Sequence, residues 1–400
     1  MRPLRWAVIG VGGYGRIHMD RVRAMTRQGQ VELCAAAEIA QDAHKDLLAE
    51  LRQAGVRVYN DYAEMLRAER PDVTSVPTPI HLHLPMALAA FEQGSNVMLE
   101  KPPAVLVQHV DRMTAEASRR GLACQVGFQN VADAAARELK ERLAAGEIGG
   151  IRELVVRGYW RRTDNYYRRA PWAGRTRLGG EWVLDGPLNN PLIHYVHEAL
   201  FLAAGDMDET ARPVAVQAEL YRAHPIEGED TVCARARLDG GALLCCYLTL
   251  CAAESSEPTV EIVGEAGRAA WRRGHYAIEG RSGRNERDGG RGDLFMNLIR
   301  HLRGEEPLWS PVRAARNVIL HNNGCFLSSG GVHAVPDRHV RRIPAPDGDV
   351  ATEVEGLIGL LEEAAAGRRL LSECGGGWAG GSREVALDFE RFDPSPLFGG

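Results

Sequence analysis

A glycine-rich loop between a strand and a helix is the feature that most restricts the fold of this chain. The apolar run at residues 6–10 leads directly into Gly10-Val-Gly12-Gly13-Tyr14-Gly15, and an amphipathic pattern follows over residues 14–27. In the pattern G-x-G-x-x-G, glycines permit a tight turn and bring the backbone close to a pyrophosphate at a helix N-terminus. The loop therefore predicts a β–α–β unit that binds a dinucleotide.

The alternation of strand and helix continues to about residue 130. Further short apolar strands are expected at residues 31–38, 57–59, 72–77, 96–100 and 123–128, with helices at 62–68, 83–93 and 107–120. Near-continuous apolar strands separated by helices indicate a parallel sheet covered on both faces. The predicted fold class is therefore α/β, with a doubly wound parallel sheet of the Rossmann type in residues 1–130.

The pattern changes after a predicted helix at residues 133–145. Strands at 151–160, 214–222, 231–238, 242–250 and 259–264 follow one another with few helices between them, and Asp239-Gly240 is a hairpin signal. This predicts a second α/β domain over residues 131–400, with an open, predominantly antiparallel sheet. Helices are expected at 293–303, 311–320 and 351–366, and the polar segment 279–293 is expected to be a mobile loop.

The composition excludes several classes of protein. The net charge of −5 gives no electrostatic reason to bind nucleic acid or an anionic membrane. No apolar run is long enough to span a bilayer, and the N-terminus lacks a secretory signal. The eight cysteines lack C-x-x-C spacing, so reduced core thiols and a cytoplasmic location are expected. No metal site is expected, because His81-x-His83 lacks further ligands nearby.

An acidic residue at the end of the second strand favours NAD as the cofactor. Glu38 lies 23 residues after Gly15, at the position that suits a hydrogen bond to the adenosine ribose. A carboxylate there would repel the additional phosphate of NADP, which is therefore the less favoured cofactor.

Several motifs together resemble the glucose–fructose oxidoreductase/inositol dehydrogenase/MocA family. They are "GVGGYG", Glu38, "TPIHLH", "EKP" and "QVGFQN", and the resemblance covers most of residues 1–330. It implies hydride transfer between a nicotinamide and a sugar, cyclitol or related carbon, and a homodimer or homotetramer formed through the exposed sheet. It also implies cofactor contacts from the glycine loop and from Glu38, Thr78, Pro79, His83, Glu100, Lys101 and Gln129, and often a cis Lys101–Pro102 bond.

This chain departs from the family pattern at the expected catalytic residues, because the family commonly carries Asp-x-x-x-His where this chain has Asp185-Gly-Pro-Leu-Asn189. An amide cannot exchange a proton at neutral pH, so Asn189 can orient a hydroxyl but cannot act as the base. The leading hypothesis gives the proton to Lys101, helped by Asp185, with His194 as the second candidate base. His194 can equally be a structural core histidine, and for His197 the structural interpretation is favoured.

An aromatic and arginine-rich segment at residues 159–175 is the candidate substrate-binding region. Aromatic faces and forked guanidinium donors suit a sugar-like substrate, including one with an acidic group. A surface loop stapled by aromatic side chains is the alternative. The residues selected are Arg161, Tyr166, Tyr167, Arg168 and Trp172.

Two other functions stay open beside an NAD-dependent dehydrogenase. One is a redox-assisted glycosidase, in which transient oxidation of a hydroxyl allows elimination of the aglycone. The other is a dinucleotide-binding regulator without catalysis. The missing histidine favours the regulator slightly, whereas Glu100-Lys101-Pro102 and Asp185 count against it.

Overall fold

The computed structural model describes residues 2–345, 348–375 and 377–398, which form two compact units. Unit 1 comprises the described residues up to 104 together with 109–127 and 294–313, and unit 2 comprises the others. The sequence assigned the helix near residue 300 to the second domain, but α9 (Leu294–Leu302) lies in unit 1. It is held there because Asn297 accepts a hydrogen bond from Gln125 and Phe295 stacks on Trp6. The division at residue 130 stays a prediction.

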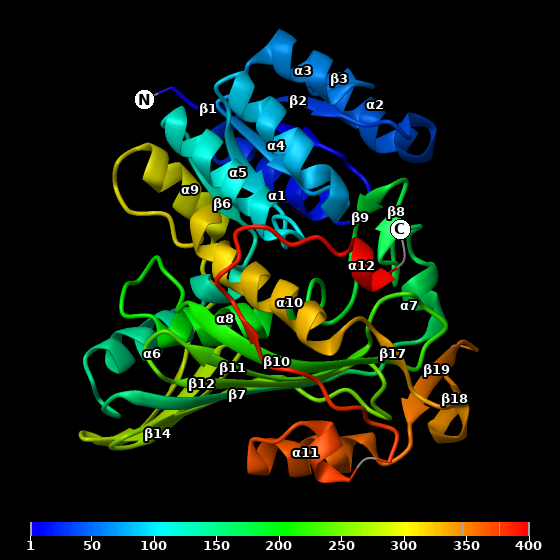
Figure 1. The fold of residues 1–400 in the computed structure, drawn as a ribbon. Coiled ribbons are helices and arrows are strands. Elements are labelled where there is room, and N and C mark those ends of the chain that lie inside the picture. The colour runs from blue at the N-terminus through cyan, green and yellow to red at the C-terminus, as the bar shows by residue number, and fades with distance from the viewer. Residues whose placement is uncertain (1, 346–347, 376, 399–400) are drawn as a thin grey trace. The chain divides into compact units, whose positions relative to one another are not determined.

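Unit 1 is built on a six-stranded parallel sheet in the order β3-β2-β1-β4-β5-β6, flanked by helices (Figure 1). This confirms the predicted doubly wound sheet. The order reverses at β1, and ligands bind at such a point beyond the carboxyl ends of the strands. The strands are β1 (Leu4–Ile9), β2 (Val31–Ala37), β3 (Arg57–Tyr59), β4 (Val73–Val76), β5 (Asn96–Leu99) and β6 (Cys124–Val126). The helices are α1 (Gly15–Arg27), α2 (Lys45–Gln53), α3 (Tyr62–Glu69), α4 (His83–Glu92) and α5 (Val107–Arg119).

Local signals fix these elements. All four residues of β4 are buried, as the apolar runs predict for a sheet covered on both faces. The Asp61 carboxylate accepts a hydrogen bond of 2.6 Å from the Glu64 N–H, so the predicted cap of α3 is present. Gly94 follows α4 with φ of 78°, a left-handed conformation that suits glycine.

Unit 2 contains a larger sheet in the order β16-β15-β14-β13-β7-β12-β11-β10-β17, and β20 also pairs with β10. Among the described strand pairs of this sheet, only β7–β12 and β10–β17 are parallel, so the predicted predominantly antiparallel character is confirmed. The strands are β7 (Ile151–Tyr159), β10 (Pro213–Arg222), β11 (Thr231–Leu238), β12 (Leu243–Thr249), β13 (Thr259–Gly264), β14 (Arg268–Arg272), β15 (His275–Gly280), β16 (Gly283–Asp288), β17 (His333–Ala334) and β20 (Val385–Ala386).

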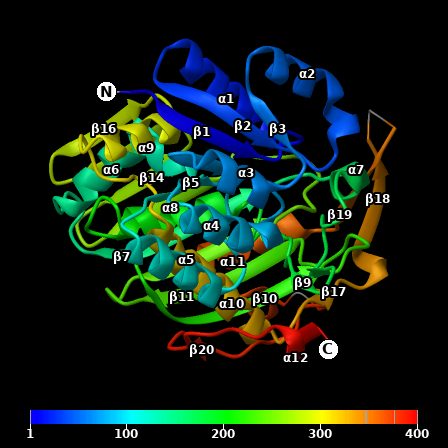
Figure 2. The ribbon, with the colours of Figure 1, turned by 90° about the horizontal axis from the view of Figure 1, so that it is seen from above.

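Three expectations for unit 2 were wrong. Residues 283–288 form β16, an edge strand paired with β15, because its charged side chains find cross-strand partners such as His275 with Asp288. The helix expected at 311–320 begins later, as α10 (Arg316–Ser329). The helix expected at 351–366 begins only at Leu357, because the residues before it form β19 (Val350–Val354), which pairs with β18 (Val340–Pro344). This hairpin was not anticipated, and it lies beside α7 (Asp164–Arg168) in both ribbon views (Figures 1 and 2).

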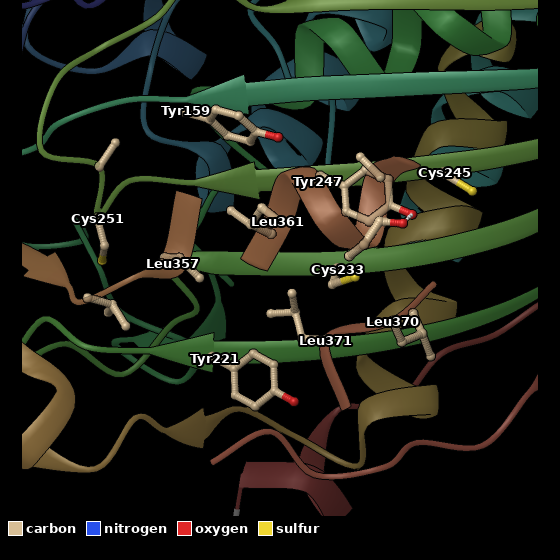
Figure 3. Packing of buried hydrophobic residues seen from close by; sticks show 14 of the residues in the cluster. Tyr159, Tyr221, Cys233, Cys245, Tyr247, Cys251, Leu357, Leu361, Leu370 and Leu371 are labelled. Atoms are coloured by element: carbon tan, nitrogen blue, oxygen red, sulfur yellow. Dashed lines mark hydrogen bonds between the residues drawn. The ribbon is translucent and has the colours of Figure 1, made fainter. Parts of the chain in front are cut away.

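Helices cover the two faces of the unit 2 sheet unequally. The helices α6 (Ala134–Ala144), α8 (Ile193–Ala203) and α10 lie on one face, and α11 (Leu357–Gly367) lies on the other (Figure 1). Leu357 and Leu361 of α11 pack against the apolar side chains of β7, β10, β11 and β12 (Figure 3). The Tyr247 hydroxyl donates to the Ala364 carbonyl oxygen at 3.0 Å. The face that the resemblance implies to be exposed is therefore covered along these four strands.

All eight cysteines lie among the described residues and none forms a disulfide. Seven of them are buried, and Cys374 is partly exposed. In the described part of the chain, no helix is both long and apolar enough to cross a membrane.

We expect Leu361→Ala to lower the free energy of unfolding by about 3 kcal/mol, because removing a buried leucine leaves a cavity between α11 and the sheet. Chemical denaturation monitored by circular dichroism measures the change. Ala366→Ser, at an exposed position of the same helix, is the control and should change stability by less than about 0.5 kcal/mol. Equal stability of Leu361→Ala and wild type would contradict the packing described for α11.

Candidate functional site

Two positions of the glycine loop between β1 and α1, Gly12 and Gly15, have no room for a larger residue. A Cβ at Gly15 would lie 2.2 Å from the Gly10 carbonyl oxygen, and one at Gly12 would lie 2.5 Å from the His44 ring. Gly10 and Gly13 have φ of 84° and 52°, and Tyr14 immediately precedes the helix. The first turn of α1 carries no acidic side chain. A close backbone approach at a helix N-terminus of this kind suits a pyrophosphate.

Glu38 follows β2 and lies against the glycine loop. Its carboxylate accepts hydrogen bonds from the Val11 N–H at 2.9 Å and from the Ala40 N–H at 2.8 Å. The next residue, Ile39, is 89% exposed, and Tyr14 is 45% exposed. An anchored carboxylate beside exposed apolar side chains fits the ribose and adenine of a dinucleotide, so the residues present fit the cofactor that the sequence predicts.

The other predicted cofactor residues of unit 1 follow β4 and β5. Thr78 and Pro79 are partly exposed, and the Thr78 methyl group borders Gly10. His83 is buried and faces backbone carbonyl oxygens, so its ring does not line an open surface. Lys101 is half-buried, its N–H donates to the Glu100 carboxylate at 3.1 Å, and the Lys101–Pro102 bond is cis.

In unit 2, a turn between residues 184 and 190 holds Asp185. The Gly174 N–H donates to Asp185 Oδ2 at 2.7 Å, and the Asn190 side chain donates to Oδ1 at 2.8 Å. Arg169 lies 3.7 Å from the same carboxylate. The preceding residue, Leu184, has φ of 44°, a conformation that costs about 1 kcal/mol or more in a residue other than glycine. The turn is therefore built around the Asp185 carboxylate.

Asn189 is enclosed in the same turn. Its side chain donates to the Leu184 carbonyl oxygen at 3.1 Å and accepts from Asn322 at 3.2 Å, and it is fully buried. The neighbouring Asn190 side chain binds Asp185, and α8 begins three residues later at Ile193. The N-cap residue is Leu192, whose apolar side chain cannot cap the helix.

The two histidines of α8 pack against Phe128. His197 stacks on its ring with centroids 3.9 Å apart, and His194 meets the ring edge at 5.9 Å. Burial lowers the pKa of His197 to about 3, which identifies it as a neutral core residue near pH 7. His194 is 7% exposed. Gln129 follows Phe128 and is exposed.

The segment at 159–175 contains an alternating stack of arginines and aromatic rings. The Arg162 guanidinium lies 4.6 Å from the Trp160 ring and 4.8 Å from the Tyr166 ring. Arg169 lies 3.7 Å from Tyr166 and 4.8 Å from Trp172. Cation–π contacts therefore order this segment internally. Arg161 lies elsewhere, with its N–H bound to Ser255.

A hollow of about 860 Å³ borders this segment within unit 2. Tyr167 and Arg168, which the sequence selected, line it, whereas Trp172 and Tyr166 are not among the lining residues. The lining residues are Asp164, Tyr167, Arg168, Arg169, Ala170, Pro171, Ala173, Gly174, Arg175, Pro225, Ile226 and Glu227. Gly174 links the hollow to the Asp185 turn, because its N–H binds that carboxylate.

Two buried glutamates, Glu229 and Glu198, have fewer hydrogen-bond donors around their carboxyl groups than Asp185 has. Glu229 lies beneath the turn, where one oxygen accepts from the Leu188 N–H at 3.2 Å and the other has no hydrogen-bond partner among the described residues. Burial raises the pKa of Glu229 to about 8. Burial also raises the pKa of Glu198 on α8, where neither carboxylate oxygen has such a partner in the described chain. Glu229 is therefore largely protonated in the folded protein near neutral pH, and burial favours the protonated form of Glu198.

His224, Asp230 and Cys251 form the one group of potential metal ligands found among the described residues. Asp230 Oδ2 already accepts hydrogen bonds from the N–H groups of Ala223 and His224 and from the His224 ring. An oxygen with three donors has little capacity left for a cation, so this cluster is a satisfied hydrogen-bond network.

Sequence reasoning missed several residues of these sites, namely Ile39, His44, Arg169, Arg175, Glu227 and Glu229. Ile39 could have been found from the sequence, because it directly follows Glu38. An apolar residue at that end of β2 is expected at the surface beside the cofactor rather than in the core. The others depend on contacts between segments that are distant in the sequence.

Comparison with known proteins identifies two matching family models. Residues 4–128 match "Oxidoreductase family, NAD-binding Rossmann fold", and residues 136–270 match "GFO/IDH/MocA C-terminal domain". Among curated proteins, the D-glucoside 3-dehydrogenase of Escherichia coli is 31% identical over 157 residues, 39% of this chain and 43% of that protein. The scyllo-inositol 2-dehydrogenase (NAD(+)) of Bacillus subtilis is 27% identical over 159 residues, 40% of this chain and 44% of that protein. The chain thus spans less than half the length of these relatives.

Solved structures share the fold. The WlbA dehydrogenase of Bordetella pertussis, solved with NADH and UDP-GlcNAcA, has a TM-score of 0.69 at 24% identity, covering 82% of this chain and 97% of that one.

We expect the stability of the protein to fall as the pH rises from about 4.5 towards 8, because unfolded Glu229 ionises there while the buried carboxyl stays protonated. Glu198 contributes a slope of the same sign. Glu229→Gln should flatten the slope and stabilise the protein near pH 7.5 by roughly 1–4 kcal/mol. Urea denaturation at pH 5, 6.5 and 8 measures this. The control, Glu227→Gln at a half-exposed site, should leave the slope in place. An identical slope in Glu229→Gln and wild type would contradict the assignment.

Proposed function

The chain belongs to the GFO/IDH/MocA family of oxidoreductases with an NAD-binding Rossmann fold, and on that premise we propose that it is an NAD-dependent dehydrogenase of a hydroxyl-bearing ring carbon. The observation that carries the proposal is the Glu38 carboxylate, held by two backbone N–H groups beside the glycine loop. A bound NAD would supply the hydride acceptor, and Glu38 would bind the adenosine ribose and disfavour NADP.

We propose that the hollow of unit 2 binds the substrate, and that the substrate is an uncharged polyhydroxylated ring. The three lining arginines each face a carboxylate: Arg168 lies 2.9 Å from Asp349, Arg169 lies 3.7 Å from Asp185, and Arg175 lies 3.4 Å from Glu227. Because these charges are already matched, the hollow offers little net attraction to an acidic group. Planar ion pairs do offer many donors and acceptors to hydroxyl groups. This argument favours a neutral sugar or cyclitol over the acidic one that the arginine content suggested.

For the proton, we propose that Lys101 receives it from the reacting hydroxyl and that Asp185 orients that hydroxyl, with His194 as the alternative acceptor. Asn189 supports the turn that carries Asp185, since its amide is engaged on both sides. The resemblance also supports the proposal of a homodimer or homotetramer, and the free cysteines support the proposal of a cytoplasmic location.

The function is tested by incubating the purified protein with NAD and a panel of neutral sugars, glycosides and cyclitols, each paired with its uronic acid where one exists. The expected result is stoichiometric NADH absorbance with a neutral compound, at least tenfold faster than with its acidic counterpart and faster than with NADP. Glycoside cleavage without net NADH would instead identify a redox-assisted glycosidase. Dinucleotide binding without any turnover would identify a regulator.

Single-turnover hydride transfer tests the assigned residues. We expect Lys101→Met and Asp185→Asn to slow it by about 100-fold or more, because general acid–base groups contribute about 10²–10⁴-fold. His194→Ala should slow it by less than tenfold. Asp72→Asn, which removes a carboxylate that accepts hydrogen bonds from the Arg2 side chain and the Arg5 backbone N–H, is the control for loss of a carboxylate and should leave the rate unchanged. Undiminished rates in the first two variants would refute the assignment, and a larger loss in His194→Ala would transfer the role to His194.

A further inference from the structure

Two buried histidines of unit 1 lie against the loop that carries Lys101. His18 is the fourth residue of α1 and His83 is the first residue of α4, and each is 1% exposed. Neither side chain is accessible to a ligand on the surface. The elements that follow β1 and β4 flank the loop after β5, because the three strands are neighbours in the order β1-β4-β5.

His18 holds the loop through Glu100. His18 Nε2 lies 3.0 Å from Glu100 Oε1, and Glu100 Oε2 accepts the Lys101 N–H at 3.1 Å. Gly127, just after β6, closes the remaining side, since a Cβ there would lie 2.7 Å from Glu100 Oε1. The His18 ring is set edge-on against Phe295, with centroids 5.0 Å apart. The Glu100 carboxylate is thus turned inwards and joins α1, the helix behind the glycine loop, to the backbone of Lys101.

His83 holds the same loop from the other side. Its Nδ1 lies 2.8 Å from the Pro102 carbonyl oxygen, and its Nε2 lies 2.8 Å from the Thr78 carbonyl oxygen. A carbonyl oxygen only accepts, so the ring is the donor in either contact. Burial lowers the pKa of His83, so the neutral ring donates to one of the two loops at a time. Whichever nitrogen carries the proton, the ring lies between the segment after β4 and the segment after β5 and donates a hydrogen bond to one of them.

We propose that His18 and His83 are positioning residues for Lys101, which brace residues 100–102 from two sides without touching cofactor or substrate. The inference rests on the proposed role of Lys101 in the reaction. Catalytic groups lose much of their effect when they are displaced by about 1 Å, so a loop that carries one needs support from packed neighbours. The family resemblance implied that Glu100 and His83 contact the cofactor. In this proposal they instead support the loop that carries Lys101.

The composition of the chain makes Lys101 unusually easy to observe. Only three of the 48 basic residues are lysines, namely Lys45, Lys101 and Lys140, and the other 45 are arginines. Lys140 is fully buried. Reductive methylation with ¹³C-formaldehyde therefore gives a spectrum in which the signals of Lys101 and Lys45 are resolved by comparison with Lys101→Met. This readout needs no substrate.

The kinetic test compares His18→Phe, His18→Gln and His83→Phe in single-turnover hydride transfer. We expect His18→Phe and His83→Phe to lower the rate by roughly 10–100-fold while the Kd for NAD changes less than threefold. His18→Gln, which keeps a donor towards Glu100, should recover most of the loss. In the Lys101→Met background, His18→Phe should lower the hydride-transfer rate by less than a further threefold, because His18 acts through the lysine. His301→Phe, on α9 of the same unit, is the control and should leave the rate unchanged.

Two kinetic outcomes would overturn the brace: an equal loss from His18→Phe in the Lys101→Met background, or a fall in NAD affinity as large as the fall in rate. The methyl spectrum tests the positioning role of His18 and His83 even if no compound on the panel is oxidised. A shifted or broadened Lys101 signal in His18→Phe and His83→Phe, with Lys45 unchanged, would support the brace although the proposed function had failed. An unchanged Lys101 signal in both folded variants would refute it, whatever the activity.

Discussion

Burial of carboxylates together with their hydrogen-bond donors is the constraint on which both candidate sites depend. An ionised carboxylate taken out of water is costly unless donors replace the solvent. Glu38, Glu100 and Asp185 are each less than 10% exposed, and each accepts at least one backbone N–H. Glu229 shows the contrast, because it has a single donor and its pKa rises to about 8. Burial therefore favours the neutral form of Glu229, whereas Glu38 and Asp185 each accept two hydrogen bonds that fix the position of the carboxylate.

Most of unit 1 could be predicted from the sequence, because its signals are local. Apolar strands, the Asp61 cap and the helix-ending Gly94 each act within a few residues. The strand β16 was missed for the opposite reason. Its sequence, GRNERD, is polar, and its strand character comes from pairing with β15, where His275 meets Asp288 across the hairpin. Composition alone cannot distinguish a charged edge strand from a loop.

The candidate sites also contain some residues that local sequence could predict and some contacts that it could not. The glycine loop and Glu38 lie within one β–α–β unit, so their proximity was predictable from spacing, and the Val11 N–H does bind the Glu38 carboxylate. Asp185 was also selected, but its surroundings were not, since Gly174 and Arg169 reach it from another segment. The arginines of that segment suggested an acidic ligand because a sequence lists charges without their partners. Once the partners are known, the same arginines argue for a neutral one.

The replacement of a histidine by Asn189 changes where the proton can go. The amide is fully buried and engaged on both sides, so it holds the turn and exchanges no proton. His197 cannot take over, because a base whose pKa is about 3 accepts little proton near pH 7. Among the remaining candidates, Lys101 is the one whose loop is anchored by buried residues of three neighbouring elements, through His18, His83 and Gly127. Such support costs conformational freedom and buries polar groups. A surface lysine does not need this support, whereas a proton acceptor needs it to be held in place.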